Sequence, residues 1–219
     1  MKYIDIHTHT YKNQPETIQL LNVFPEEQEK WQFPCYFSVG LHPWYVNEDT
    51  WKHKVEIVRL ASSLPNVMAI GETGLDKAVG VAMPVQLAAF EEQLLIAENS
   101  RKAVIIHCVR SYSEILAYRK KSDRSIPWIF HWYNSNEQTA RELIRKNCFL
   151  SFGHMLFNEQ SKAYNVFKNM PAENIFLETD DAGYTIQQVY EQAALIRNIH
   201  RDTLKSLILD NFARCFKIT

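Results

Sequence analysis

The chain has 219 residues and lacks any long hydrophobic run. No stretch approaches the roughly 18 apolar residues that a membrane-spanning helix needs, and the N-terminus shows no apolar signal region. The four cysteines include no pair with CxxC spacing, which argues against a disulfide framework or a redox motif. We therefore expect buried, reduced thiols, a cytoplasmic location and no membrane partner.

A strong charge of one sign is also absent, because 24 Lys and Arg residues stand against 25 Asp and Glu residues. Such a balance does not predict a broad basic face for gripping long nucleic acid. The one basic cluster, Arg119-Lys120-Lys121 with Arg124, is expected to be a solvated helix end. No linker, repeat or low-complexity segment divides the chain, so we expect a single domain over residues 1–219. Nothing in the sequence indicates an obligate protein partner.

Short apolar runs alternate with longer amphipathic ones. Most of the short runs are nearly continuously apolar, as in parallel strands that are covered on both faces. The expected strands are Lys2–Ile6, Thr17–Val23, Cys35–Gly40, Val67–Gly71, Ala103–His107, Trp128–His131, Cys148–Phe152 and Asn174–Glu178. The expected helices are Asp49–Ser63, Pro84–Ser100, Tyr112–Lys120, Asn136–Lys146 (with Asn136 as a candidate cap), Glu159–Met170, Gln187–Ile199 and Asp202–Phe216.

Eight strands with helical crossovers predict a TIM-type (β/α)8 barrel, with a doubly wound open sheet as the alternative. Only Thr8 to Glu16 separates the first two expected strands, which is too short for a helical crossover of about a dozen residues. We therefore expect a distorted barrel whose first crossover helix is missing. Thr17–Val23 is the weakest strand assignment, and the barrel would lack a strand if this segment were helical.

Polar residues recur where the expected strands end. His7 and His9 close the first strand at i, i+2 spacing, which points both imidazoles to one face. Later strand ends carry His42, Glu72, His107, His131, His154 and Asp180. A lone histidine there is more often a cap, but several at the rim where βα loops build active sites predict a metal centre. Imidazole and carboxylate ligands suit several divalent ions, and such ions can activate water for hydrolysis.

The motifs at these positions form an ordered set: His7-Thr8-His9, Gly40-Leu41-His42-Pro43, Gly71-Glu72-Thr73-Gly74-Leu75-Asp76, Ile106-His107, Phe130-His131 and Glu178-Thr179-Asp180. In this order they resemble the TatD family of metal-dependent hydrolases, which belongs to the amidohydrolase-like superfamily. Gln86 with Phe90 is similar to the family's Q-x-x-x-F helix, and Asn211-Phe212 to its closing N-F. The resemblance covers essentially the whole chain.

The resemblance implies a TIM-type barrel that holds one or two divalent metal ions, with Zn, Mg and Mn as the candidates. It implies that the metal ligands are His7, His9, Glu72, His107, His131 and Asp180, with Glu72 bridging two ions. Asp180 would also orient or deprotonate the attacking water, and Glu72 and His42 would complete the catalytic set. His42 would face a phosphate oxygen of the substrate.

Two departures from the family pattern concern further candidate substrate contacts. Arg110 stands one place later than the arginine of the family's H-x-R, which leaves its contact to a phosphate open. His154 follows Gly153 where the family has a glycine pair, and its alternatives are a substrate-facing role and a rim or loop role. After Asp180, Asp181-Ala182-Gly183 replaces the usual A-P or S-P, and a shortened loop there predicts a more open cleft. Four aromatic residues follow two of the histidines, and rim packing is favoured for them over stacking on bases: Trp44, Tyr45, Trp132 and Tyr133.

The leading functional hypothesis is a metal-dependent deoxyribonuclease, implied to be a 3′-5′ exonuclease on single strands. The alternative is a hydrolase of another ester or amide bond, such as an aminoacyl-tRNA deacylase or a small phosphoester hydrolase. Balanced charge mildly favours a short substrate over long duplex DNA. A non-catalytic, metal-stabilised scaffold is disfavoured because the ligand set, including Asp180, is complete.

Overall fold

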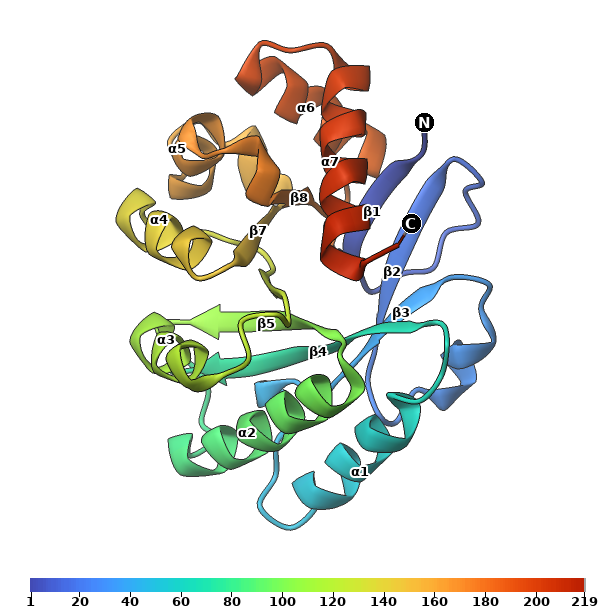
Figure 1. Ribbon diagram of the computed structural model, residues 1–219, viewed down its shortest axis with the longest axis vertical. Coiled ribbons are helices and arrows are strands. Elements are labelled where there is room, and N and C mark those ends of the chain that lie inside the picture. The colour runs from blue at the N-terminus through green and yellow to red at the C-terminus, as the bar shows by residue number, and fades with distance from the viewer. Residues whose placement is uncertain (219) are drawn as a thin grey trace. The chain divides into compact units, whose positions relative to one another are not determined.

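The computed structural model describes residues 1–218 of the chain, coloured from the N-terminus to the C-terminus in Figure 1. It divides into two compact units. The central unit is Asn22–Phe130, and the terminal unit combines Met1–Leu21 with the chain from His131 onward. No helix within residues 1–218 is long and apolar enough to cross a membrane.

Strands and helices alternate along most of the chain. The strands are β1 (Tyr3–Thr8), β2 (Thr17–Val23), β3 (Tyr36–Val39), β4 (Val67–Asp76), β5 (Ala103–Val109), β6 (Trp128–Phe130), β7 (Cys148–Phe152) and β8 (Ile175–Leu177). The α-helices are α1 (Trp51–Ala61), α2 (Met83–Ser100), α3 (Tyr112–Lys121), α4 (Glu137–Arg145), α5 (Lys162–Asn169), α6 (Ile186–Arg197) and α7 (Arg201–Phe216). Short 3-10 turns include η2 (Pro43–Tyr45) and η3 (His154–Phe157).

Every described strand pair is parallel. In the central unit β3 pairs with β4, β4 with β5 and β5 with β6. In the terminal unit β1 pairs with β2, β7 pairs with β8, and a parallel bridge joins Thr8 to Asp180. The helices cover these strands: α2 packs along β4, and α7 packs against β1 (Figure 1). This is the strand content and connectivity of a (β/α)8 barrel.

The connection from β1 to β2 contains no helix, as the sequence predicts. The doubtful second strand is confirmed, because Thr17–Val23 pairs with β1 from Tyr3↔Thr17 onward. Its residues Leu20 and Leu21 are buried. The predicted helices are found within a few residues of their expected bounds, and the Asn136 side chain caps α4 by accepting a hydrogen bond from the Thr139 amide at 2.9 Å.

Strand β4 is longer than predicted: the expected end was Gly71, and the strand continues to Asp76. The pairing with β5 shifts register between Ile70 and Thr73 and then resumes as far as Asp76↔Val109. Gly74 allows this close approach, since a Cβ atom there would lie 1.9 Å from the carbonyl oxygen of His107. Glu72, which was expected to follow the strand, therefore lies inside it.

All four cysteines are free thiols. Cys148 and Cys215 are buried as expected, but Cys35 and Cys108 are only half-buried. Burial raises the pKa of the Cys35 thiol to about 11 and that of Cys108 to about 12. Both thiols are therefore protonated and weakly nucleophilic at neutral pH.

The prediction of a solvated basic helix end is wrong for Arg119. Lys120, Lys121 and Arg124 are exposed, but Arg119 is fully buried on α3. Its guanidinium carbon lies 4.9 Å from the ring centroid of Trp128, and its nitrogens donate to the carbonyl oxygens of Asp123 and Arg124. The aliphatic stem and planar head of arginine fit such a site, where they pack on an aromatic ring and close the helix end.

Replacing Arg119 with alanine should lower the free energy of unfolding by about 2–4 kcal/mol, because it leaves a cavity beside Trp128 and removes the donors to the Asp123 and Arg124 carbonyl groups. Lys120→Ala, one residue further along the same helix and exposed, should change it by less than about 0.5 kcal/mol. Urea unfolding of both variants measures the difference. Equal stability of the two variants would rule out this structural role.

Candidate metal centre

The terminal unit gathers four of the predicted ligands, here called the terminal cluster: His7, His9, His131 and Asp180. One donor atom from each of His7, His131 and Asp180 lies within 4.8 Å of the others. Asp180 Oδ1 lies 3.5 Å from His7 Nε2 and 3.3 Å from His9 Nε2. The rings of His7 and His131 have centroids 4.4 Å apart. The i, i+2 spacing of the two histidines therefore brings both to the same carboxylate.

Backbone hydrogen bonds explain why Asp180 sits between the two histidines. Its amide donates to the His7 carbonyl at 2.9 Å, and its own carbonyl accepts from the His9 amide at 3.3 Å. The buried carboxylate of Asp5 accepts from the Thr179 amide at 2.9 Å and from the Thr179 hydroxyl at 2.7 Å. Asp180 itself has a φ of 53°, in the left-handed region that non-glycine residues seldom adopt. Asp5 was not predicted as a site residue.

Three carboxylates in this unit, of which Asp5 and Glu178 are buried and Asp180 is half-buried, differ in their pKa values. Burial would raise the pKa of Asp180, but hydrogen bonds from His7 and His9 outweigh it and hold that pKa below its usual range. Burial raises the pKa of Glu178 to about 8 and that of Asp5 to about 6. Asp180 is therefore the anionic acceptor of the cluster. Glu178, which accepts a hydrogen bond from the Trp132 amide at 2.5 Å, was also missed as a site residue.

The central unit holds a second group of buried donors, here called the central cluster: His42, Glu72 and His107. Their donor atoms lie within 4.8 Å of one another. Glu72 Oε1 lies 2.8 Å from His107 Nδ1 and 3.1 Å from His42 Nε2, and the two histidine nitrogens are 3.1 Å apart. His42, which was expected to face a substrate phosphate, thus lies against two predicted metal ligands.

Buried side-chain amides hold the backbone of this cluster. Asn22 accepts from the Glu72 amide at 2.7 Å through its Oδ1. Gln93 of α2 accepts from the Leu41 amide at 2.7 Å and donates to the Leu41 carbonyl at 3.1 Å, immediately before His42. Sequence reasoning missed Asn22 and Gln93, because each acts on a residue 50 or more positions away in the chain.

Asp76 stands behind His107 in the central unit. Its Oδ2 lies 3.0 Å from His107 Nε2, on the opposite side of the ring from Glu72. Burial would lower the pKa of His107, but its hydrogen bonds with Glu72 and Asp76 outweigh burial and raise that pKa. With a divalent ion bound, a proton kept on Nε2 by Asp76 would leave Nδ1 as the ligand atom of His107. Carboxylates behind metal-bound histidines have this role in many proteins.

Imidazole nitrogens and carboxylate oxygens are the only donors in the two clusters. This donor set fits Zn²⁺, Mn²⁺ and related divalent ions, whereas Ca²⁺ prefers oxygen ligands alone. The donors are mostly buried and already within a few ångströms of one another in each cluster. The residues present therefore fit the predicted cofactor, and the chemistry of the set does not choose among the ions.

The two further expected substrate contacts, Arg110 and His154, differ in their exposure. Arg110 is exposed directly after β5 and has a φ of 54°. His154 begins η3 in the terminal unit, half-buried, with its ring 5.8 Å from that of Trp132. Among the aromatic residues, Tyr133 is buried and its hydroxyl donates to the Asn136 carbonyl at 2.7 Å. Trp44, Tyr45 and Trp132 are exposed.

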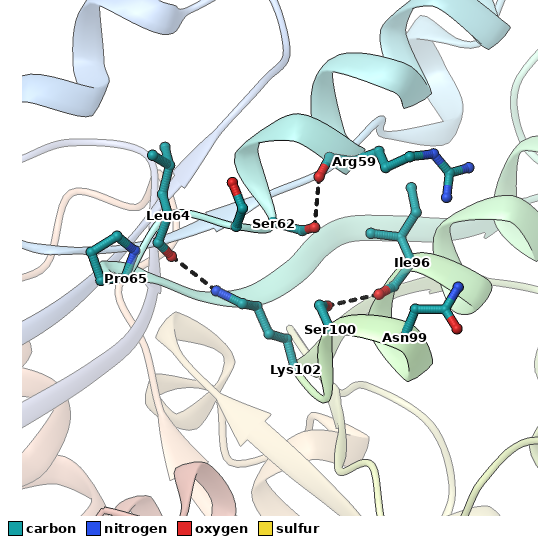
Figure 2. A pocket seen from close by; sticks show the side chains of 9 residues that line it. Arg59, Ser62, Leu64, Pro65, Ile96, Asn99, Ser100 and Lys102 are labelled. Atoms are coloured by element: carbon teal, nitrogen blue, oxygen red, sulfur yellow. Dashed lines mark hydrogen bonds between the residues drawn. The ribbon is translucent and has the colours of Figure 1, made fainter.

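A separate cleft of about 490 Å³ lies in the central unit where α1 and α2 end (Figure 2). Its lining residues include Arg59, Leu64 and Ser100, with no histidine or carboxylate among them. The Lys102 ammonium on its wall donates to the carbonyl oxygens of Leu64 and Val67. This cleft is near the beginning of β5, whereas His107 lies near the end of the same strand, so the cleft is distinct from the central cluster.

A family model described as TatD related DNase matches residues 6–217 of the chain. The protein belongs to the TatD family and is a metal-dependent hydrolase. Its fold is a TIM-type barrel, as predicted. The crystal structure of YjjV, a TatD homologue from Escherichia coli K12, superposes on it with a TM-score of 0.87 at 20% identity, over 99% of this chain and 98% of that one.

Two relatives illustrate how far the sequence similarity extends. YabD of Bacillus subtilis, named an uncharacterized metal-dependent hydrolase, is 26% identical over 206 residues, which cover 87% of this chain and 80% of YabD. A protein of Cronobacter turicensis named 3′-5′ ssDNA/RNA exonuclease TatD is 30% identical over 151 residues, covering 67% of this chain and 57% of that protein.

Proposed function

We propose that this hydrolase cleaves phosphodiester bonds in single-stranded DNA, removing nucleotides from the 3′ end. The observation that carries the proposal is the pairing of buried histidines with carboxylates in both clusters, which is the donor chemistry of metal-assisted phosphodiester hydrolysis. The relative named as a 3′-5′ ssDNA/RNA exonuclease adds support for the choice of substrate.

In this proposal the metal ligands are His7, His9, Glu72, His107, His131 and Asp180. A divalent ion, when bound, supplies Lewis acidity and lowers the pKa of a coordinated water. Asp180 orients the attacking water and accepts its proton at a carboxylate oxygen. Asp5 and the backbone of His7 and His9 hold the backbone of Thr179 and Asp180 in place, which limits the reorganisation of this segment during the reaction.

Contacts to the substrate come from three further residues in the proposal. His42 donates a hydrogen bond to a phosphate oxygen next to Glu72 and His107. Arg110, exposed after β5, pairs with a phosphate further along the strand, and His154 binds a phosphate or base from η3. Glu72 takes part in catalysis as a ligand whose position is held by Asn22.

End-labelled single-stranded DNA tests the proposed activity. Protein stripped with a chelator is incubated with the labelled strand, and Mg²⁺, Mn²⁺ and Zn²⁺ are added back separately. Stepwise shortening from the 3′ end with at least one ion is the expected result. Intact DNA with every ion, in protein that binds metal stoichiometrically, would reject DNA as the substrate.

The second candidate is hydrolysis of a short substrate, either an aminoacyl ester or a small phosphoester. The observation that favours it is the net charge of −1, since long nucleic acids are gripped mainly through released counterions at basic surfaces. A panel of phosphodiesters, phosphomonoesters and acyl esters separates the two candidates. The first proposal predicts the highest kcat/KM on the phosphodiesters, and the second predicts it on another class.

A further inference from the structure

Trp44 is an exposed aromatic residue that is nevertheless held in one orientation. More than half of its surface, 56%, is open to solvent. Its only polar side-chain atom, the indole Nε1, donates to Asp76 Oδ2 at 2.7 Å, and Asp76 is itself only 2% exposed. Its backbone amide donates to His42 Nδ1 at 3.1 Å, within the η2 turn. A tryptophan that only covered a rim would not need its indole nitrogen fixed by a buried carboxylate.

Asp76 provides a rigid attachment for the indole. Its Oδ1 accepts from the Ala78 amide at 2.7 Å. The side chain of Gln86 accepts from the Asp76 amide at 2.8 Å and donates to its carbonyl at 3.0 Å. The oxygen that receives the indole N–H also lies 3.0 Å from His107 Nε2. One carboxylate oxygen therefore orients both an exposed aromatic face and a member of the central cluster.

The imidazole neighbours of the indole meet it at steep angles, and more than half of the Trp44 surface stays exposed beside them. The rings of His42 and His107 have centroids 5.0 Å and 6.0 Å from that of Trp44, at interplanar angles of 87° and 77°. Neither imidazole lies parallel to the indole, so neither of them stacks on it. A planar ring that stacked on Trp44 would lie next to His42 and His107 of the central cluster.

We propose that Trp44 is a stacking platform for an unpaired nucleobase, and that Asp76 is the positioning residue that fixes both Trp44 and His107. The inference rests on the proposed function and specifies how the substrate is recognised. Every base has a face that can stack on an aromatic ring, so such a contact requires a single strand but tolerates any sequence. Duplex DNA keeps its bases stacked on one another and is therefore excluded from this contact.

Binding of a fluorescein-labelled oligothymidylate, compared with an abasic oligonucleotide of the same length, tests the platform. The measurements use Asp180→Asn protein loaded with metal, so that the strand is not consumed. Trp44→Ala should weaken binding of oligothymidylate about tenfold and leave binding of the abasic strand within about twofold. Trp44→Phe, which keeps a ring but loses the hydrogen bond to Asp76, should fall between wild type and Trp44→Ala.

Tyr36→Ala is the matched control, because Tyr36 is an aromatic residue of the same unit that is 37% exposed at the beginning of β3. It should bind both strands as the parent protein does. Equal oligothymidylate affinity in Trp44→Ala and Tyr36→Ala would overturn the platform. The platform would also be overturned if the parent protein and Trp44→Ala showed the same preference for oligothymidylate over the abasic strand.

The positioning role of Asp76 has a readout that does not depend on activity. Asp76→Asn should weaken metal binding about 10- to 100-fold in a direct titration, because the Nε2 proton of His107 loses its anionic acceptor. Trp44→Ala should leave metal affinity within about twofold, since Asp76 and His107 remain paired. Unchanged metal affinity in Asp76→Asn would remove that role.

Cleavage of end-labelled DNA by the wild-type enzyme separates failure of this inference from failure of the proposed function. If wild type shortens the strand and Trp44→Ala does so with the same KM, the platform is wrong while the exonuclease proposal stands. If wild type neither binds nor cleaves single strands, the exonuclease proposal fails and the platform fails with it. The expected result is cleavage by wild type and a KM raised about tenfold in Trp44→Ala.

Discussion

Replacing Asp180 with asparagine should lower kcat for DNA cleavage by about a thousandfold. The amide keeps the size of the side chain, but it cannot accept the proton of the attacking water. It also cannot serve as the anionic partner of His7 and His9, whose Nε2 atoms lie 3.5 Å and 3.3 Å from Asp180 Oδ1. Rates under saturating DNA and metal measure the effect.

The matched control is Asp181→Asn, since Asp181 is the neighbouring carboxylate and is exposed. This variant should retain activity within about twofold, and both variants should unfold at temperatures close to that of the wild type. Full activity in folded Asp180→Asn protein would show that another group activates the water. Equal losses of activity in the two variants would indicate a disturbance of the segment after β8 that contains both residues, and not a specific role of the Asp180 carboxylate.

Removal of the metal should reduce hydrolysis to background. The buried histidines and carboxylates of both clusters have the donor chemistry of a divalent site, and an ion held there would lower the pKa of a bound water and so supply a strong nucleophile at neutral pH. Activity should return on adding back one of the candidate ions and should follow the occupancy of the sites. Rates measured over a metal titration of chelator-treated protein provide the comparison.

Thermal unfolding gives the same prediction a second readout. An ion that binds only the folded chain stabilises it by about 2.7 kcal/mol at a concentration a hundred times its Kd, so the midpoint should rise with metal concentration. The ion that restores activity should also produce the largest rise at equal occupancy. Hydrolysis that persists in protein with no detectable metal would exclude metal dependence.

Local patterns in the sequence were sufficient to predict the barrel. Apolar runs located all eight strands, including Thr17–Val23, and Asn136 was identified as a helix cap. The missing first crossover helix followed from the short separation of the first two strands. These features depend on neighbouring residues or on spacing along the chain, which a sequence displays directly.

Features that depend on distant partners were predicted less well. The length of β4 follows from its pairing with β5, which resumes after a register shift, so composition alone ended the strand too early. Arg119 belongs to a run of basic residues that normally indicates solvent. It is buried because Trp128 and two carbonyl groups form a site for it. A charged residue in such a run carries no local sign of burial.

In the candidate site too, features that depend on local spacing were predicted, and features that depend on distant partners were missed. The i, i+2 spacing of His7 and His9 predicted that both face one point, and both lie beside the Asp180 carboxylate. The expected strand ends indicated the other candidates, of which Glu72 lies inside β4 instead of after it. The residues that position them were missed, because buried amides and carboxylates such as Gln93, Asn22 and Asp5 look like ordinary polar residues in the sequence. Their hydrogen bonds to Leu41, Glu72 and Thr179 link segments that are between 50 and 174 residues apart.

The metal content of purified protein tests the central claim most directly. Elemental analysis of the wild type should find one or two equivalents of a divalent ion per chain, with lower content in His131→Ala for the terminal cluster and in His107→Ala for the central cluster. His200→Ala is the control, because the His200 side chain is 77% exposed and lies outside both clusters, and it should retain the wild-type content. Wild-type metal content in both cluster variants would contradict the account.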